Sequence, residues 1–167
     1  LLTIYIYYIQ LFKKINNIFK NDINYLKLCD IIKERVKKMK VLSIIEPWAS
    51  LIANGKKSIE TRSWKTSYRG ELYIHASKKK EKVTQHIQEL MALMPDIKME
   101  YGNIICKCNL VDCIYMDEKF INKIKENKIE YLCGEYSIGR YAWILDNVEM
   151  LDEKIPARGK LNIWNFY

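Results

Sequence analysis

The chain has 167 residues, of which 49% are hydrophobic and 29% are charged. This composition is typical of a globular protein and excludes a wholly disordered, collagen-like or coiled-coil chain. The length fits one ordinary domain, or a domain of about 130 residues with an extension. The formal net charge of +8 suggests a polyanionic partner such as RNA, DNA or an anionic membrane surface.

The positive charge is concentrated in two segments. Residues 1–38 carry seven Lys and one Arg against three acidic residues, a net charge of +5. Residues 56–80 carry eight basic and two acidic residues, a net charge of +6, whereas the chain after residue 80 is net acidic. The sequence therefore predicts a local basic surface rather than a generally basic protein.

The segment 1–38 reads differently from the rest of the chain. Its opening apolar run, 1–12, is shorter than the roughly 20 residues that a membrane span needs, and it lacks the features of a signal peptide. Because the chain begins with Leu and Met39 opens the well-patterned region, we expect 1–38 to be an extension of a domain at 39–167. It is either translated upstream sequence or an amphipathic helix that docks on a partner or a membrane.

From residue 39 onward, short strands alternate with helices. Strands are predicted over 41–45, 57–64, 71–77, 104–115, 141–148 and 162–166. Helices are predicted from Pro47 to a cap at Gly55, over 79–94 with Val83 on its buried stripe, and from Asp117 towards Leu132. The pattern predicts an α+β fold, a small mixed or antiparallel β-barrel with two or three flanking helices, because closing the sheet removes exposed edges.

Five cysteines without paired CxxC spacing indicate reduced thiols in a cytoplasmic protein. Cys106 and Cys108 would share one face of a strand and Cys113 the other, so we expect small buried hydrophobes rather than zinc ligands. No set of His, Asp, Glu and Cys shows the spacing of metal ligands. The sequence predicts no metal, no cofactor and no membrane partner.

Residues 55–64 read GKKSIETRSW and carry an unusual density of charge for a short strand. In a regular strand Glu60 and Arg62 lie on one face, where they can pair with each other or orient a third group. The alternative is a solvated strand edge with a surface ion pair that contributes little to stability.

These residues resemble the hallmark of the ASCH domain, a relative of the PUA-like barrels. The hallmark has the form GxKxxExR, which Gly55, Lys57, Glu60 and Arg62 match without a gap. The flanking blocks LSIIEPWASLI, SWKTSYRGELYIHAS, GRYAWIL and IPARGKLNIWNF are also similar, so that the resemblance covers 39–167. It implies a PUA-like barrel that binds RNA or a modified nucleoside in a cleft lined by the hallmark.

The chemistry of single residues suggests which contacts each would make with a nucleotide in this cleft. Lys57 and Arg62 can donate hydrogen bonds to a phosphate or to a base edge, and Glu60 can accept one from an exocyclic amino group. Trp48, Trp64 and Tyr68 are candidates for base stacking, with core packing as the alternative. The full set of candidate ligand-binding residues is Trp48, Lys57, Glu60, Arg62, Trp64, Tyr68, His75, Ser77 and Arg140. His75 is either a proton carrier or a hydrogen-bonded structural residue. The run 78–80 either is the solvated start of a helix or extends the basic surface towards a nucleic-acid backbone. Arg158, like Arg140, is a candidate for the rim of the cleft.

Three functions follow as hypotheses. The first is a binding module for RNA or a modified nucleoside. The second is an enzyme, since a branch of the superfamily hydrolyses acetylated cytidine with a Lys, a Thr and a Glu. Here Lys57 and Glu60 would be catalytic in an amidohydrolase acting on acylated nucleosides or in a ribonuclease. Glu60 fills the Thr position, however, and Thr61 is expected to face the other side of the strand. The third is a protein-interaction domain with a vestigial cleft.

Overall fold

The computed structural model describes residues 38–80 and 82–167. The predictions made for 1–38 therefore concern residues that are not described, with the exception of Lys38. Residues Lys40–Trp164 form one compact unit. All three pockets described below lie in the unit Lys40–Trp164.

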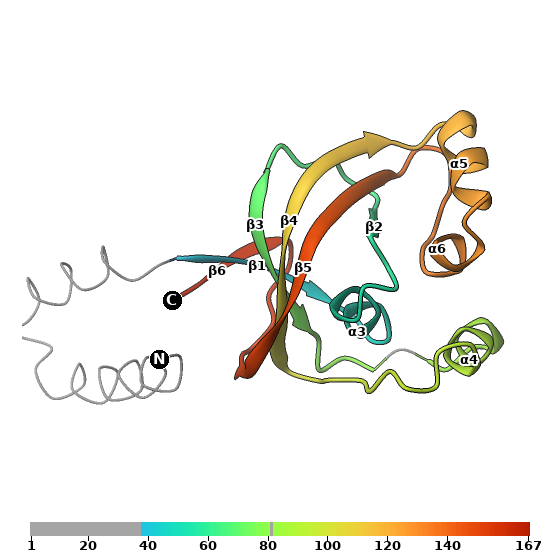
Figure 1. The fold of residues 1–167 in the computed structure, drawn as a ribbon. Coiled ribbons are helices and arrows are strands. Elements are labelled where there is room, and N and C mark those ends of the chain that lie inside the picture. Colours follow the sequence, from blue (N-terminus) through green and yellow to red (C-terminus); the bar gives the residue numbers. More distant parts are fainter. Residues whose placement is uncertain (1–37, 81) are drawn as a thin grey trace, which may run out of the picture. The chain divides into compact units, whose positions relative to one another are not determined.

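Six strands of the described residues form one mixed sheet (Figure 1). They are β1 (Met39–Ile44), β2 (Ile59–Arg62), β3 (Gly70–Ala76), β4 (Asn103–Tyr115), β5 (Tyr141–Pro156) and β6 (Ile163–Phe166). The order is β2-β5-β4-β3-β1-β6, with β1 parallel to β3 and the pairs β2/β5, β3/β4 and β4/β5 antiparallel. The long strands β4 and β5 bend, so that the sheet curls. The predicted α+β fold with a barrel-like mixed sheet is confirmed.

The short helix α3 (Trp48–Ala53) fills the interior of the curled sheet. Its residues Ala49 and Ile52 are fully buried against side chains of β3 and β5, among them Leu72 and Trp143. The buried carboxylate of Glu46 fixes the start of α3, because it accepts hydrogen bonds from the Ser50 amide (3.0 Å) and the Ser50 hydroxyl (2.7 Å). The apolar interior therefore holds α3, which carries Trp48, in a defined place.

The other described helices are α4 (Gln85–Ala92), α5 (Glu118–Lys125) and α6 (Lys128–Leu132). The prediction of a helix over 79–94 is wrong at its start, because Thr84 caps α4 by accepting a hydrogen bond from the Ile87 amide. Val83 is 70% exposed and does not belong to the buried stripe. The single helix predicted from Asp117 is divided in two, because Asn127 accepts a hydrogen bond from the Glu130 amide and starts α6.

The described thiols are buried as predicted, but Cys113 packs in the same core cluster as Cys106 and Cys108 rather than on the other face, because the register of β4 shifts between Leu110 and Asp112. Cys106, Cys108 and Cys113 are free and buried, and burial raises the pKa of Cys108 to about 12. Within 38–80 and 82–167, no group of three or more His, Cys, Asp or Glu side chains could hold a metal ion. None of the helices in these two ranges is long and apolar enough to cross a membrane.

Candidate functional site

A left-handed glycine directs the hallmark lysine into the protein. Gly55 follows α3 with φ +68°, a conformation in which a side chain is strained. The amides of Lys56 and Lys57 then both donate to the carbonyl of Leu51. The predicted glycine cap is confirmed, and the chain leaves the turn with Lys56 exposed and Lys57 buried.

Lys57 is 1% exposed, and its ammonium group donates two hydrogen bonds inside the protein. The Nζ atom donates to the carbonyl of Ile59 and, at 2.8 Å, to the carbonyl of Cys133. It also lies 3.7 Å from Oε2 of Glu60. Because Cys133 follows α6, Lys57 ties the hallmark strand β2 to that helix.

A buried carboxylate supports the hallmark strand from α6. Glu130 is 5% exposed and accepts from the Ser58 amide (2.7 Å), the Ser58 hydroxyl (2.8 Å) and the Ile59 amide (3.3 Å). The hydroxyl of Tyr136 donates to the same carboxylate at 2.8 Å. Burial, followed by the nearby Glu130 charge, raises the pKa of Tyr136, so Tyr136 stays a donor. These bonds fix the backbone that presents Glu60.

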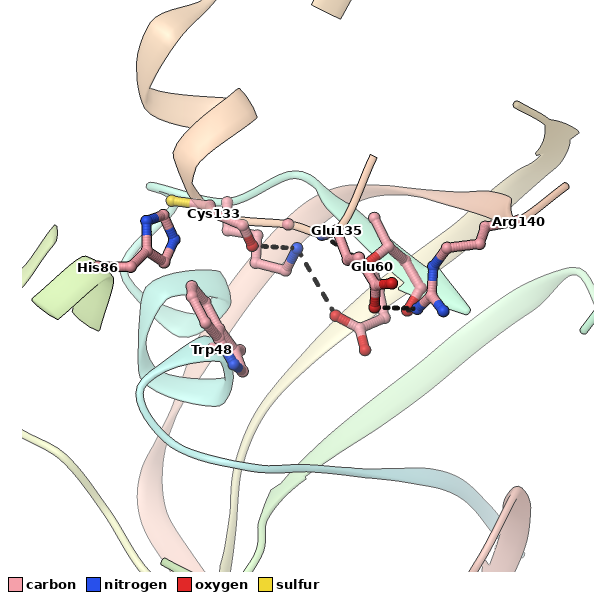
Figure 2. A pocket seen from close by; sticks show the side chains of 9 residues that line it. Trp48, Glu60, His86, Cys133, Glu135 and Arg140 are labelled. Atoms are coloured by element: carbon pink, nitrogen blue, oxygen red, sulfur yellow. Dashed lines mark hydrogen bonds and ion pairs between the residues drawn. The ribbon is translucent and has the colours of Figure 1, made fainter. Parts of the chain in front are cut away.

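A pocket of about 430 Å³, here called the hallmark pocket, lies between α3, β2 and the segment after α6. Figure 2 shows Trp48 and His86 at one end and Glu60, Glu135 and Arg140 at the other. Its lining residues are Trp48, Lys57, Glu60, Thr61, His86, Cys133, Gly134, Glu135 and Arg140. The two cations and two carboxylates among them balance, so the pocket is close to neutral.

Arg140 closes one side of the hallmark pocket. Its Nη2 atom lies 3.2 Å from Oε2 of Glu135 and donates to the carbonyl of Thr61 at 3.4 Å. Its Nε atom is buried and has no hydrogen-bond partner among the described residues. Thr61, expected on the other side of the strand from Glu60, also lines this pocket, because the Glu135 amide donates to Thr61 Oγ1 (3.2 Å).

Glu60 and Arg62 pair as their spacing predicts. Nε of Arg62 lies 3.1 Å from Oε1 of Glu60, a charge contact without the alignment of a hydrogen bond. Arg62 itself lines a second pocket of about 570 Å³, here called the basic pocket. Its lining residues are Ser43, Ile45, Arg62, His75, Ser77, Lys78, Lys79, Arg158, Gly159, Lys160, Leu161 and Asn162. The ion pair therefore links the two pockets, since Glu60 lines the first and Arg62 the second.

Trp64 and Tyr68 line a third, open pocket of about 550 Å³, the aromatic pocket, together with Lys40, Thr66, Ser67, Asn162 and Ile163. Both aromatic side chains are half-buried and pack on the core. Trp143 meets Trp64 edge-on with ring centroids 4.6 Å apart. Trp143 and Trp164 are buried at 0% and 6% exposure, which confirms the core interpretation for these two residues.

A family model described as the ASCH domain matches residues 42–155. The chain belongs to the ASCH family. The human protein named activating signal cointegrator 1 is 32% identical over 126 residues, which are 74% of this chain and 21% of that protein. The mouse protein of the same name is 31% identical over 126 residues, with the same coverage. The chain thus spans about a fifth of the length of these relatives.

The nine candidate residues of this ASCH domain divide among three pockets rather than lining one cleft. Trp48, Lys57, Glu60 and Arg140 line the hallmark pocket. Arg62, His75 and Ser77 line the basic pocket, and Trp64 and Tyr68 line the aromatic pocket. The Glu60–Arg62 ion pair joins the first two pockets, and Asn162 lines both the second and the third.

His75 holds the wall of the basic pocket together. Its Nε2 atom lies 3.2 Å from the carbonyl of Ala157, which can only accept, so the proton resides on Nε2. Nδ1 then accepts from the Ser43 hydroxyl at 3.2 Å, and this hydroxyl accepts from Nε1 of Trp164 at 3.1 Å. Both ring nitrogens of the 1% exposed His75 are thus used within the fold.

A pH series tests this arrangement. Burial lowers the pKa of His75 from 6.5, so the unfolded chain takes up the proton at a higher pH than the folded protein. Stability is therefore expected to fall as the pH drops below 6.5. Melting temperatures between about pH 5 and pH 7 measure the fall. It should be smaller in His75→Gln, which does not titrate, and unchanged in the exposed control His86→Gln. Equal slopes in wild type and His75→Gln would contradict this role.

Sequence reasoning missed the residues that support the site from α6 and the segment after it. Glu130, Cys133 and Glu135 lie more than 70 positions from the hallmark residues they contact. A local pattern carries no information on such partners. One signal was present: Glu130 is an acidic residue at a helical position near apolar neighbours, and a carboxylate that is buried needs donors.

Proposed function

We propose that this ASCH domain binds RNA or a modified nucleoside and that the hallmark pocket receives the base. The observation that carries the proposal is the buried Nε of Arg140, a donor without a hydrogen-bond partner among the described residues. A buried donor left unpaired costs about 1–3 kcal/mol. An acceptor on a ligand in the pocket would remove that cost.

An acceptor lies at the same end of the hallmark pocket as the Arg140 donor (Figure 2). Oε1 of Glu60 is engaged by Arg62, whereas Oε2 lies 3.7 Å from Lys57, beyond ordinary hydrogen-bond distance. Oε2 therefore retains lone pairs that can accept from an exocyclic amino group. An acceptor and a donor in one pocket match the edge of a nucleobase, which carries both.

Size and charge also favour a base. The volume of about 430 Å³ lies within the range of about 300–1,000 Å³ that small-molecule pockets occupy. The half-buried indole of Trp48 offers a stacking surface, worth about 1–3 kcal/mol per base. Because the charges of the lining residues balance, the pocket suits an uncharged base better than a phosphate.

The catalytic alternative, hydrolysis of an acylated nucleoside or of RNA through Lys57, has less support. A nucleophile or base needs a free lone pair, but the Lys57 ammonium is held by two carbonyls and the Glu60 carboxylate. The thiol of Cys133 is buried, and burial raises its pKa to about 11, so it is a poor nucleophile. We therefore assign binding rather than turnover. The four cysteines among the described residues are free, which supports a reducing compartment such as the cytoplasm.

Fluorescence anisotropy with a labelled single-stranded RNA of about 12 nucleotides tests the proposal. Arg140→Ala is expected to weaken binding about tenfold, with Arg140→Lys intermediate, because Lys keeps the charge but loses the planar fork. Arg69→Ala is the matched control. Arg69 forms a similar ion pair, 3.0 Å from Asp112, but lines none of the three pockets.

Equal affinities of Arg140→Ala and Arg69→Ala would overturn the assignment of the hallmark pocket. Incubation of the wild type with acetylated cytidine distinguishes binding from catalysis. We expect no product, and release of acetate by the wild type would establish the hydrolase instead.

A further inference from the structure

The basic pocket has a composition unlike that of the rest of the site. Its lining includes five cations, Arg62, Lys78, Lys79, Arg158 and Lys160, and no carboxylate. The other polar groups are the side chains of Ser43, His75, Ser77 and Asn162. A concave surface with one sign of charge concentrates counter-ions of the other sign.

Most of these cations lack an acidic partner within the described part of the fold. No described carboxylate lies within ion-pair distance of Lys78, Lys79, Arg158 or Lys160. All four side chains are exposed at the pocket. Arg62 shares its charge with Glu60. Four like charges around one pocket repel one another, and an anion in the pocket would relieve this repulsion.

The loop that carries Arg158 and Lys160 is fixed in place against β1 and β3. The carbonyl of Ala157 binds His75, and Gly159 approaches His75 and Ser43 so closely that an added Cβ would lie 2.7 Å from the imidazole. Lys160 Nζ lies 5.7 Å from the ring centre of Trp164, a cation–π distance. The backbone that carries the two cations is therefore held in place before any ligand binds.

We propose that the basic pocket binds a phosphate group of an RNA backbone. The ligand of this domain is then a phosphorylated strand rather than a free nucleoside. Only the statement that one ligand occupies both pockets rests on the proposed function. The two pockets are linked by the Glu60–Arg62 ion pair: Glu60 lines the hallmark pocket, and Arg62, 3.1 Å away, lines the basic pocket. Phosphate binding at the basic pocket itself requires only the cations.

An abasic ribose-phosphate oligomer tests this pocket separately, because it presents phosphates without bases. In anisotropy titrations of the full chain, Arg158→Ala/Lys160→Ala is expected to weaken binding of the abasic oligomer at least tenfold. The slope of log affinity against log salt should fall by about 0.7 for each phosphate that the variant no longer neutralises. Both residues are exposed, so the variant should fold, and its melting temperature verifies this.

The matched control removes the same number of charges elsewhere. Lys119 and Lys123 are exposed on α5 and line none of the three pockets, so Lys119→Ala/Lys123→Ala should change affinity less than twofold. Equal losses of affinity in the two double variants would overturn the phosphate site, leaving only a general effect of net charge. So would binding of the wild type to phosphatidylserine vesicles but not to the abasic oligomer.

The two proposals fail separately. Suppose that Arg140→Ala weakens RNA binding but the Arg158→Ala/Lys160→Ala variant binds the abasic oligomer like the wild type. The phosphate site is then wrong, and the assignment of the base to the hallmark pocket is supported. If the abasic oligomer depends on Arg158 and Lys160 but RNA binding is indifferent to Arg140, the phosphate site stands and the base pocket is wrong.

Discussion

Replacing Lys57 by Met is expected to destabilise the protein by about 3 kcal/mol or more. Removing one partner of a buried ion pair typically costs about 3–5 kcal/mol, because the other charge stays buried. Glu60 keeps Arg62 as a partner, which places the effect at the lower end. The carbonyls of Ile59 and Cys133 are each deprived of the Nζ donor. Urea denaturation of the full chain measures the decrease in stability.

Lys56→Met is the matched control, because Lys56 precedes Lys57 in the chain and is exposed. We expect its free energy of unfolding to stay within about 0.5 kcal/mol of the wild type. Similar values for the two variants would contradict the anchoring role of Lys57. The large effect expected of Lys57→Met also means that weaker RNA binding in this variant would report unfolding, so Arg140 is the better probe of the hallmark pocket.

Glu130→Ala is expected to cost a similar amount, about 3 kcal/mol. The substitution leaves the Ser58 amide, the Ile59 amide and the Tyr136 hydroxyl without their acceptor. Each buried donor left unsatisfied costs about 1–3 kcal/mol, although water can reach Ser58, whose side chain is exposed. Urea denaturation again gives the magnitude.

Glu126→Ala provides the comparison for this variant, since Glu126 is an exposed carboxylate at the end of α5. Its effect on the unfolding free energy should be below about 0.5 kcal/mol. Glu130→Gln should lie between wild type and Glu130→Ala, because an amide keeps one acceptor oxygen and adds an NH₂ donor. A Glu130→Ala variant as stable as Glu126→Ala would show that the carboxylate does not support the hallmark strand.

The sequence was informative where the determinants are local. Gly55 marks the left-handed turn after α3 because few other residues tolerate positive φ. The two-residue spacing of Glu60 and Arg62 puts them on one face of β2, where they pair. The alternating apolar residues of 104–115 predict β4 almost to its ends. For the same reason, Cys106 and Cys108 could be assigned to the interior.

Features that depend on distant contacts could not be predicted. The division of the candidate residues among three pockets depends on how β5 and the segment after α6 pack on β2. β5 runs to Pro156, well beyond the predicted end at residue 148, because pairing with β4 continues through register shifts after the apolar alternation stops. The burial of Lys57 needs the Cys133 carbonyl, 76 residues away.

The site that results separates two kinds of chemistry within one ASCH domain. The hallmark pocket offers balanced charge, a free acceptor on Glu60 and an unpaired donor on Arg140 among the described residues. The basic pocket offers five cations without a carboxylate. A nucleotide unit has a base with donors and acceptors and a phosphate with negative charge. The two pockets, joined through Arg62, match the two parts of such a unit.

The affinity of the wild type for an RNA oligomer relative to an abasic oligomer of equal length tests this account most directly. Because a stacked base contributes about 1–3 kcal/mol, we predict that RNA binds about tenfold or more tightly than the abasic strand. Both affinities should fall as salt rises. Equal affinities would show that no base is recognised, and no binding of either oligomer at low salt would contradict the account as a whole.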